Sequence, residues 1–333
     1  MTQEYPYKKI LVTGGGGFIG SSYIKNLLEN YNGFEIMNLD IMSYATSQKT
    51  LDLFREYENF HHSHIDISDL EKVKKIFKVF SPNLVVNFAA ESHVDNSIYG
   101  AAPFIQSNIV GTFNLLEASK NLLDNSNFLF HQISTDEVFG DLDEQDPAFK
   151  ETDPYDPSSP YSASKASSDM LVSAWGRTYQ MPYLITNCSN NFGPRQYKEK
   201  LIPKIICNTI DGIEIPVYGN GLNIRDWIFV DDHTDTIIEL HKKDIKSERF
   251  NIGGNNEIGN LELIKEIMQI LESKYELSPK IKFVKDRQGH DKRYAINMTK
   301  TDKFLNRNTK YNFSKNLEAT IEWYIKNVNW WDE

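Results

Sequence analysis

The sequence is poor in cysteine and in positive charge, and it has no long apolar run. Only Cys188 and Cys207 occur in 333 residues, which excludes a disulfide framework and a cysteine-ligated zinc site. The formal net charge of −10 argues against broad binding to nucleic acid or to anionic membranes. No apolar stretch approaches the length of a membrane span, and the start from Met1 to Lys9 has no apolar signal core. We therefore expect a cytoplasmic protein that binds neither nucleic acid nor a membrane.

Motifs for hydrolysis and for metal binding are also missing. There is no Gly-x-Ser-x-Gly motif, so a hydrolase of that type has no support. His61, His62 and His64 form a histidine-rich stretch, but alternation along a strand puts only the last two on one face, and no cysteine accompanies them. Asp231 and Asp232 precede a helical pattern and are typical of helix capping. We predict no metal site.

What the chain does contain is a regular alternation of apolar runs and amphipathic helical patterns. Alternation of this kind predicts parallel strands joined by helical crossovers, so we expect an α/β fold with a doubly wound parallel sheet. The predicted strands are Ile10–Val12, Glu35–Leu39, Leu84–Phe88, Phe128–Ile133 and Tyr183–Thr186, and the predicted helices are Phe18–Glu29, Leu70–Phe80, Phe104–Asn121 and Ser162–Tyr179.

The pattern changes after about Asn190 to shorter elements separated by glycine-rich turn signals. We expect a nucleotide-binding domain over residues 1–189 and a smaller α+β substrate domain over residues 190–333. The strand-like segment Trp227–Val230 and the helix that follows it suggest that residues 225–250 return to the large sheet.

The first predicted strand runs directly into a glycine-rich loop and then into a helix. Gly14, Gly17 and Gly20 permit a tight turn, and they allow a pyrophosphate to approach the helix amides near Phe18 and Ile19. The alternative is a glycine-rich turn that binds no ligand.

Asp40 ends the second predicted strand, twenty residues after Gly20. A carboxylate at this place accepts a hydrogen bond from the ribose 2′-hydroxyl and repels a 2′-phosphate, so NAD is favoured over NADP. Asp66 and Ile67 follow a third strand and suit the adenine edge, although capping of the next helix explains Asp66 equally well.

Two further motifs supply groups for proton transfer. Tyr161 and Lys165 are four residues apart on a predicted helix, so they share one face, and the ammonium favours ionisation of the phenol. Asp136 and Glu137 offer a general acid and a general base. Neighbouring residues of an extended strand point to opposite faces, however, so the acids converge only at a strand end or a turn. A solvated Tyr-Lys pair on a helix surface is the alternative for the first motif.

These motifs together identify a resemblance. The spacing of Gly14, Gly17 and Gly20 with the downstream Tyr-x-x-x-Lys resembles the extended short-chain dehydrogenase/reductase superfamily. The segments Ala89–Asp95, Ser134–Val138, Pro160–Ala166, Asn187–Asn191 and Arg225–Trp227 resemble the dTDP-glucose 4,6-dehydratases more closely. The Thr-Asp-Glu triplet at 135–137 is the most specific part, because related epimerases and decarboxylases share the tyrosine and lysine but usually lack the acid pair.

The resemblance implies an NAD-dependent hydro-lyase acting on dTDP-glucose. Tyr161 takes the proton of the 4-hydroxyl, and Thr135 binds the same oxygen. Glu137 then removes the proton at carbon 5 while Asp136 protonates the departing 6-hydroxyl. Hydride returns to carbon 6, so the NAD is regenerated and expected to be tightly retained. A 4-epimerase or decarboxylase of the same superfamily is the nearest alternative, and a non-catalytic NAD-binding scaffold is a more distant one.

The resemblance also assigns binding residues. Ala89 and Ala90 join the cofactor residues, together with Tyr161 and Lys165. The nucleotide sugar is expected to contact a set that spans both domains: Ser92, His93, Thr135, Asn190, Lys200, Leu201, Pro216, Tyr218, Arg225, Asn260, Arg287 and His290. Without the resemblance, we would interpret Arg225 as the partner of Asp226 in a local ion pair. We would interpret Arg287, Lys292 and Arg293 as a solvated cationic stretch.

Some positions depart from the usual pattern of these dehydratases, including Ile41, Asn96, Phe139, Phe192 and Gln288. We expect the adenosine and nucleotide contacts to differ there. The resemblance further implies a homodimer that pairs helices of two subunits, and the apolar faces of 104–121 and 170–175 suit such pairing. The same faces also suit packing on the chain's own sheet.

Overall fold

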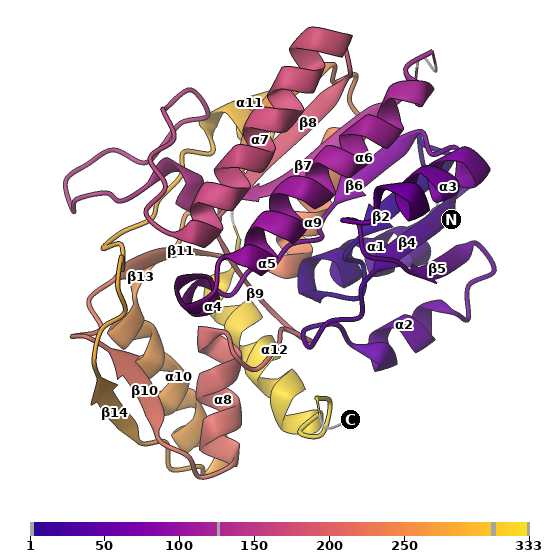
Figure 1. Ribbon diagram of the computed structural model, residues 1–333. Coiled ribbons are helices and arrows are strands. Elements are labelled where there is room, and N and C mark those ends of the chain that lie inside the picture. Colours follow the sequence, from indigo (N-terminus) through magenta and orange to yellow (C-terminus); the bar gives the residue numbers. More distant parts are fainter. Residues whose placement is uncertain (1–2, 125–126, 308–310, 332–333) are drawn as a thin grey trace.

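The protein is described by a computed structural model covering residues 3–124, 127–307 and 311–331. A seven-stranded sheet forms the centre of its larger part (Figure 1). Every neighbouring pair in this sheet is parallel, and chain order reverses between β2 and β6, the kind of switch point at which ligands bind in open α/β sheets. The predicted doubly wound fold is confirmed. In spatial order the strands are β12 (Ser247–Ile252), β8 (Tyr183–Cys188), β7 (Leu129–Thr135), β6 (Leu84–Asn87), β2 (Lys9–Thr13), β4 (Glu35–Asp40) and β5 (Phe60–His64).

The central strands are the ones that the apolar runs predict. All residues of β6 and β7 are buried, and β6 is apolar up to Asn87, whereas β7 also buries the polar side chains of His131, Gln132, Ser134 and Thr135. The two edge strands differ: β5 reads Phe-His-His-Ser-His and β12 reads Ser-Glu-Arg-Phe-Asn-Ile. An edge strand is partly exposed and needs no continuous apolar run, so the sequences of these two segments do not clearly predict strands.

Helices cover both faces of the sheet (Figure 1). One face packs against α1 (Phe18–Asn30), α2 (Gln48–Phe54) and α9 (Val230–His241). The other packs against α3 (Leu70–Phe80), α6 (Thr112–Ser119) and α7 (Pro160–Tyr179). The short strands β1 (Gln3–Glu4) and β3 (Tyr31–Asn32) pair outside the sheet.

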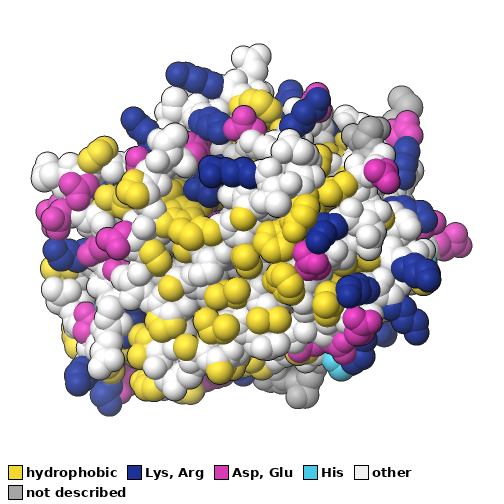
Figure 2. All heavy atoms as spheres, turned by 45° about the horizontal axis from the view of Figure 1, so that its top comes forward, with side chains coloured by type: hydrophobic (Ala, Val, Ile, Leu, Met, Phe, Trp, Pro, Cys, Tyr) yellow, Lys and Arg dark blue, Asp and Glu magenta, His cyan; other side chains and the backbone are white. Residues whose placement is uncertain are grey.

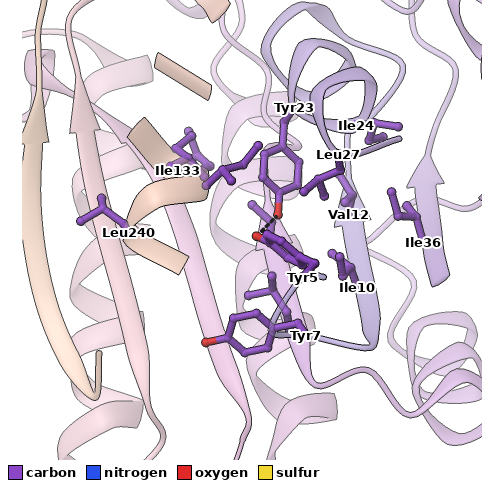
Figure 3. Packing of buried hydrophobic residues seen from close by; sticks show 14 of the residues in the cluster. Tyr5, Tyr7, Ile10, Val12, Tyr23, Ile24, Leu27, Ile36, Ile133 and Leu240 are labelled. Atoms are coloured by element: carbon purple, nitrogen blue, oxygen red, sulfur yellow. Dashed lines mark hydrogen bonds between the residues drawn. The ribbon is translucent and has the colours of Figure 1, made fainter. Parts of the chain in front are cut away.

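A buried polar chain runs through the core beneath α1 and α9. The Tyr5 and Tyr23 hydroxyls lie 3.3 Å apart among aliphatic side chains (Figure 3). The Tyr5 hydroxyl lies 2.7 Å from His241 Nδ1, and His241 Nε2 lies 2.8 Å from His131 Nδ1. Burial lowers the pKa of the His241 imidazole to about 3, so this chain is neutral at pH 7.

The predicted helix over 104–121 is interrupted. It comprises α5 (Ala102–Phe104), a π-helical segment (Ile105–Gly111), α6, and a 3-10 turn (Lys120–Leu122). The buried Asn108 in the π segment bonds both the amide and the carbonyl of Glu91, at 2.9 and 3.0 Å, and donates to Ser164 of α7 at 2.8 Å. The interruption therefore anchors the loop after β6 to α7.

The second part of the molecule has its own core. A three-stranded sheet contains β13 (Glu257–Gly259), β11 (Ile224–Phe229) and β9 (Asn190–Phe192), and β10 (Ile215–Tyr218) pairs with β14 (Ile281–Val284). Three helices complete this core: α8 (Leu201–Ile210), α10 (Asn260–Tyr275) and α12 (Phe313–Lys326). Within residues 225–250, β11 stays in the small sheet, whereas α9 packs on α1 and β12 joins the large sheet.

The remaining helices are short. The α4 helix (Val94–Tyr99) follows the loop after β6, and α11 (Thr299–Leu305) packs against β12. Among the residues that the structure describes, no helix combines the length and the apolar character needed to cross a membrane.

Candidate active site

A cavity of about 460 Å³ lies at the carboxyl ends of the central strands. The loops after β2, β4, β6, β7 and β8 all contribute to its wall, as expected for the switch point of a doubly wound sheet. It brings together eighteen residues predicted from sequence: Gly14, Gly17, Phe18, Ile19, Gly20, Asp40, Asp66, Ile67, Ala89, Ala90, Ser92, Thr135, Asp136, Glu137, Tyr161, Lys165, Asn190 and Lys200.

The glycine loop is shaped by close backbone contacts. Gly14 has φ +68°, and a Cβ there would lie 2.8 Å from Ala89 Cα. A Cβ at Gly20 would lie 2.5 Å from the Gly14 carbonyl oxygen. Gly17 is the N-cap residue of α1 and has no side chain that could accept a hydrogen bond from the first helix amides. These amides therefore face the cavity. This is the cradle that a pyrophosphate requires.

Asp40 connects the end of β4 to this loop. It is 5% exposed and accepts hydrogen bonds from the Gly16 amide, the Met42 amide and the Thr46 hydroxyl, each at 2.9 Å. A carboxylate accepts about four hydrogen bonds, so capacity remains for a ribose hydroxyl. Asp66 accepts from the Ser68 amide at 2.8 Å, whereas Asp69 caps α3; the capping alternative for Asp66 is therefore wrong.

The acid pair sits where a strand becomes a turn. The β7 strand ends at Thr135, and a 3-10 turn (Asp136–Phe139) begins at once. The Thr135 hydroxyl accepts from the Glu137 amide at 3.3 Å and thereby caps the turn. Because the chain leaves the extended conformation, both acids line the cavity, and the alternation that separates neighbours on a strand does not apply.

The two carboxyl groups have different electrostatic environments. Burial raises the pKa of Asp136 well above its usual range, and Glu137 and Asp226 raise it further. Burial also raises the pKa of Glu137, but Arg287, Arg225 and Lys200 oppose this. Asp136 therefore keeps its proton more readily, and Glu137 ionises more readily. Two neighbouring carboxyl groups whose pKa values differ in this way can act as a general acid and a general base.

Tyr161 and Lys165 project from the first turns of α7. Pro160 occupies the start of the helix, and Ser159 and Ser162 form a reciprocal capping box. Tyr161 is 8% exposed, and the buried Lys165 ammonium donates to the Ile133 carbonyl at 2.6 Å. The helix start is thus fixed relative to β7.

The phenol differs from the sequence expectation in one respect. Burial raises the pKa of Tyr161 well above its usual range, Glu137 and other nearby acidic groups raise it further, and a hydrogen bond from Thr135 lowers it. The spacing to Lys165 predicted a lowered value. In the protein alone that prediction is wrong, because burial and the acid pair outweigh the helix neighbour.

Of the predicted substrate residues near the loop after β6 and β9, Ser92, Asn190 and Lys200 line the cavity, whereas His93 and Leu201 do not. The Lys200 ammonium donates to the Ser92 carbonyl at 2.9 Å, and the Asn190 side-chain oxygen is buried without a hydrogen-bond partner among the described residues. His93 caps α4 and lies 3.8 Å from Glu199, and burial lowers the pKa of its imidazole to about 4. Leu201 begins α8.

The remaining predicted residues do not line the cavity, although Arg225 and Arg287 act on it by lowering the pKa of Glu137. Arg225 uses three of its five N–H donors on the carbonyl oxygens of Ile224, Lys292 and Asp291, and its guanidinium lies 4.3 Å from the centre of the Tyr294 ring. Asp226 instead accepts from the Gly254 and Asn256 amides, so the predicted local ion pair of Arg225 is wrong.

A second cluster surrounds Asp95. Tyr218 of β10 donates to Asp95 at 3.2 Å, and Arg287 lies 3.6 Å from the same carboxylate. His290 pairs with Asp286 at 2.6 Å. Pro216 precedes Tyr218 on β10, and Asn260 begins α10 with its side-chain oxygen buried and unpartnered among the described residues.

The cationic stretch does not form one solvated run. Lys292 pairs with Asp143, and the buried Arg293 pairs with Glu257, both away from the Asp95 cluster.

Residues that the sequence did not single out also line the cavity, among them Glu91, Cys188, Tyr197 and Glu199. Glu91 and Cys188 lie within the segments Ala89–Asp95 and Asn187–Asn191, so their position beside predicted site residues could have indicated them. Tyr197 and Glu199 lie in a turn with no periodic pattern.

No group suited to hold a metal ion occurs among the described residues. His62 Nδ1 lies 3.1 Å from the Asn38 side chain, and His64 Nε2 lies 2.9 Å from the Ile41 carbonyl. Asp231 and Asp232 lie within the first turn of α9, and Phe229 occupies the cap position, so the capping prediction for these acids is wrong.

The chain matches known proteins along nearly its whole length. Residues 11–320 match the family described as GDP-mannose 4,6 dehydratase. The dTDP-glucose 4,6-dehydratase of Haemophilus influenzae is 47% identical over 338 residues, which cover 96% of this chain and 98% of that protein. The dTDP-glucose 4,6-dehydratase of Neisseria meningitidis serogroup B is 45% identical over 341 residues, covering 97% and 95%. This chain belongs to the dTDP-glucose 4,6-dehydratase family.

Solved structures agree with this assignment. The dTDP-glucose 4,6-dehydratase of Bacillus anthracis, determined in complex with NAD, has a TM-score of 0.87 at 40% identity and covers 98% of this chain and 99% of that chain. A UDP-glucose 4-epimerase of Thermotoga maritima has a TM-score of 0.85 at 28% identity, covering 96% and 99%. Dehydratases and epimerases thus share this fold, and the side chains at the site must distinguish their reactions.

Three departures from the usual dehydratase pattern can be placed. Ile41 is 50% exposed and lines the cavity beside Asp40. Asn96 hydrogen-bonds Tyr44, and Gln288 is exposed. Ile41 therefore borders the place where the adenosine half is expected, whereas Asn96 lies in α4 and does not line the cavity.

Proposed function

We propose that this protein converts dTDP-glucose to dTDP-4-keto-6-deoxyglucose as an NAD-dependent hydro-lyase. The observation that carries this proposal is the turn after β7, which directs Asp136 and Glu137 into the cavity that also holds the glycine loop, Tyr161 and Lys165. An epimerase needs the tyrosine and the cofactor but has no step that requires the acid pair.

The site fits NAD on its own geometry. Gly14 and Gly20 leave no room for a Cβ against the neighbouring backbone, so glycine is needed for the close-packed loop at the start of α1, and Asp40 retains acceptor capacity at the end of β4. Its carboxylate also disfavours the 2′-phosphate of NADP. When bound, NAD accepts the hydride from sugar carbon 4 and returns it to carbon 6.

The side chains then divide the proton transfers. Tyr161 takes the proton of the 4-hydroxyl as the phenolate, a form that the Lys165 ammonium and the positive charge of bound NAD would favour against the effect of burial. The Thr135 hydroxyl binds the same oxygen. Glu137, favoured as the ionised carboxyl by three cations, removes the proton at carbon 5 that the neighbouring ketone has acidified. Asp136, favoured as the protonated carboxyl, donates to the departing 6-hydroxyl. One water leaves, and carbon 5 is protonated again after hydride returns.

The second part of the chain holds the nucleotide. Arg225 has two N–H donors beyond its three backbone contacts, which suits a diphosphate oxygen pair. Arg287, Lys200, Asn190 and Asn260 supply further cationic and amide groups, and Pro216 and Tyr218 flank the base. In this division residues 1–189 hold NAD, residues 190–333 hold the nucleotide sugar, and the chain returns to the large sheet within about 225–250.

Two further features belong to the proposal. Ile105, Phe113 and Met170 are 46%, 38% and 59% exposed on the π segment, α6 and α7, and apolar side chains spread across the face seen in Figure 2. A second copy of the chain would cover this surface, giving a homodimer. We also assign the protein to the cytoplasm, which the low cysteine content of the chain supports.

The deciding experiment gives purified protein, without added NAD, dTDP-glucose or its UDP, CDP or GDP counterpart, and identifies products by mass spectrometry. The proposal predicts loss of one water from dTDP-glucose at the highest rate. A product of unchanged mass that NMR shows to have inverted configuration at carbon 4 would identify an epimerase instead. Preference for another nucleotide would revise the substrate but not the reaction.

A further inference from the structure

Asp169 extends the functional face of α7. It lies one turn beyond Lys165 and two turns beyond Tyr161, so the three side chains follow one helix face. Its side chain is 0% exposed, behind the cavity wall rather than in it. Asp169 is therefore placed to act on the site through its neighbours and not by touching substrate.

One oxygen of this carboxylate ties three elements together. Asp169 Oδ2 accepts from the Ser134 hydroxyl at 2.6 Å, from the Tyr155 hydroxyl at 2.7 Å and from the Asn187 amide at 3.4 Å. Ser134 directly precedes Thr135 and the acid pair, and Asn187 also donates to the Thr135 carbonyl at 3.0 Å. The helix that carries Tyr161 and Lys165 is thus joined to the strand end that carries Thr135.

The other oxygen has no such partner. Asp169 Oδ1 is buried without a hydrogen bond among the described residues. A buried carboxylate with an unsatisfied oxygen is unfavourable unless a cation compensates its charge. The Lys165 ammonium, one turn away and also buried, uses one of its three donors on Ile133.

The charged and titratable surroundings of both groups are few. Lys165, Arg249 and Tyr155 face Asp169, and Arg249 stacks on the Tyr155 ring at 4.7 Å. Asp169 and Cys188 face Lys165. Burial lowers the pKa of the Lys165 ammonium, and Asp169 is the larger of the two influences that raise it. Burial raises the pKa of Asp169, and Lys165 is the largest influence that lowers it.

We propose that Asp169 is a positioning residue for the reaction: it is the buried counter-ion that keeps Lys165 protonated, and it fixes the end of β7 against α7. The charge coupling rests on the spacing of the two residues along α7 and on the burial of both, and does not require the proposed function. Its kinetic consequence rests on the proposed function.

The direct test is the titration of Lys165 in the full-length protein labelled with [ε-13C]lysine, with the resonance assigned by its loss in Lys165→Met. Asp169→Asn keeps the size of the side chain and removes its charge. We expect the midpoint of Lys165 to fall by on the order of one pH unit. Tyr155→Phe removes one hydrogen bond to the same oxygen and keeps the charge, so it should leave the midpoint in place. An unchanged midpoint in Asp169→Asn overturns the proposal.

Single-turnover oxidation of dTDP-glucose gives the kinetic readout. In Asp169→Asn the alkaline limb of the pH profile should move to lower pH with the Lys165 midpoint, with about a tenfold lower rate at that limb. Tyr155→Phe should lower the rate without moving the alkaline limb. If Asp169 had only a structural role, both variants would lower the rate and leave the limb in place. A shifted midpoint in a protein that makes no dehydrated product refutes the proposed function and leaves the coupling intact.

The reciprocal measurement covers the case in which Asp169→Asn does not fold. Coupling between two titrating groups is symmetric, so Lys165→Met should raise the midpoint of Asp169, followed with [γ-13C]aspartate, by the same amount. An Asp169 midpoint that is equal in wild type and in Lys165→Met overturns the proposal.

Discussion

The two sides of the cavity are built by different means. On the β2 and β4 side, close backbone contacts around Gly14 and Gly20 shape the wall, together with the Asp40 carboxylate, which accepts three hydrogen bonds. On the β7 and α7 side, buried ionisable side chains with shifted pKa values do so. We therefore expect substitutions that add side-chain volume to disrupt the β2 and β4 side. Substitutions that change charge or proton affinity should disrupt the β7 and α7 side.

The largest effect should come from the ionisable side. Tyr161→Phe removes the group that takes the 4-hydroxyl proton, so NADH formation in a single turnover should fall by about 10²–10⁴. Tyr179→Phe, on the same helix and 41% exposed, is the matched control. Hydride transfer at the wild-type rate in Tyr161→Phe would remove the phenol from the mechanism.

The backbone side is tested by adding a single methyl group. Gly14→Ala places a Cβ 2.8 Å from backbone atoms at a positive φ, and we expect it to cost about 2–4 kcal/mol of unfolding free energy and to empty the NAD site. Gly212 has nearly the same φ, +69°, with open space around it, so Gly212→Ala should cost only about 1 kcal/mol. Equal losses in thermal unfolding and equal NAD content would show that the close contact is unimportant.

Two buried sets of ionisable groups should have opposite effects on stability as pH changes: the core histidines of α9, which belong to neither side of the cavity, and the acid pair of the β7 and α7 side. Burial lowers the pKa of His241 and His233 to about 3, so the unfolded chain binds protons first and stability falls as pH drops below about 6.5. The expected loss is about 2 kcal/mol per histidine between pH 7 and 5. The raised pKa values of Asp136 and Glu137 have the opposite sign, because their protonated forms favour the folded state in acid and this contribution is lost as pH rises.

Denaturant unfolding measured across this pH range separates the contributions. His241→Gln should make the acid-side slope shallower by up to one proton, whereas Asp136→Asn should make the net loss in acid steeper. Identical slopes in both variants and wild type would mean that neither buried set titrates on unfolding.

The smallest effect is expected at the nucleotide. Arg225→Lys keeps the charge but loses the planar fork and the stacking on Tyr294, so KM for dTDP-glucose should rise about tenfold with little change in kcat. Arg55→Lys, in an exposed ion pair with Asp52, is the control. A fall in kcat at constant KM would assign Arg225 to the chemical step instead.

The backbone side was the easier one to predict from sequence. Its strand, glycines, helix and Asp40 lie within forty residues, and glycine spacing directly encodes tight backbone geometry. The edge strands β5 and β12 were the hard part of the fold, because partial exposure removes the apolar signal on which strand prediction depends.

The ionisable side depends on structure that sequence does not specify locally. The convergence of Asp136 and Glu137 requires the strand to end at Thr135, and nothing in the alternating pattern marks that residue. The raised pKa of Tyr161 follows from burial by several elements of the fold. The helix spacing identifies only one neighbour of the phenol, Lys165. Asp169 stands at the same spacing beyond Lys165, and its importance becomes visible only when Ser134, Tyr155 and Asn187 gather on one oxygen.

The central claim is that both acids act on one sugar held against the cofactor. The most direct measurement follows NADH absorbance and product after NAD-loaded Glu137→Gln is mixed with dTDP-glucose. NADH should form at nearly the wild-type rate and persist, because carbon 5 keeps its proton, while the dehydrated product appears about 10²–10⁴ times more slowly. Product formation at the wild-type rate would contradict the claim, because the sugar would then lose water without Glu137.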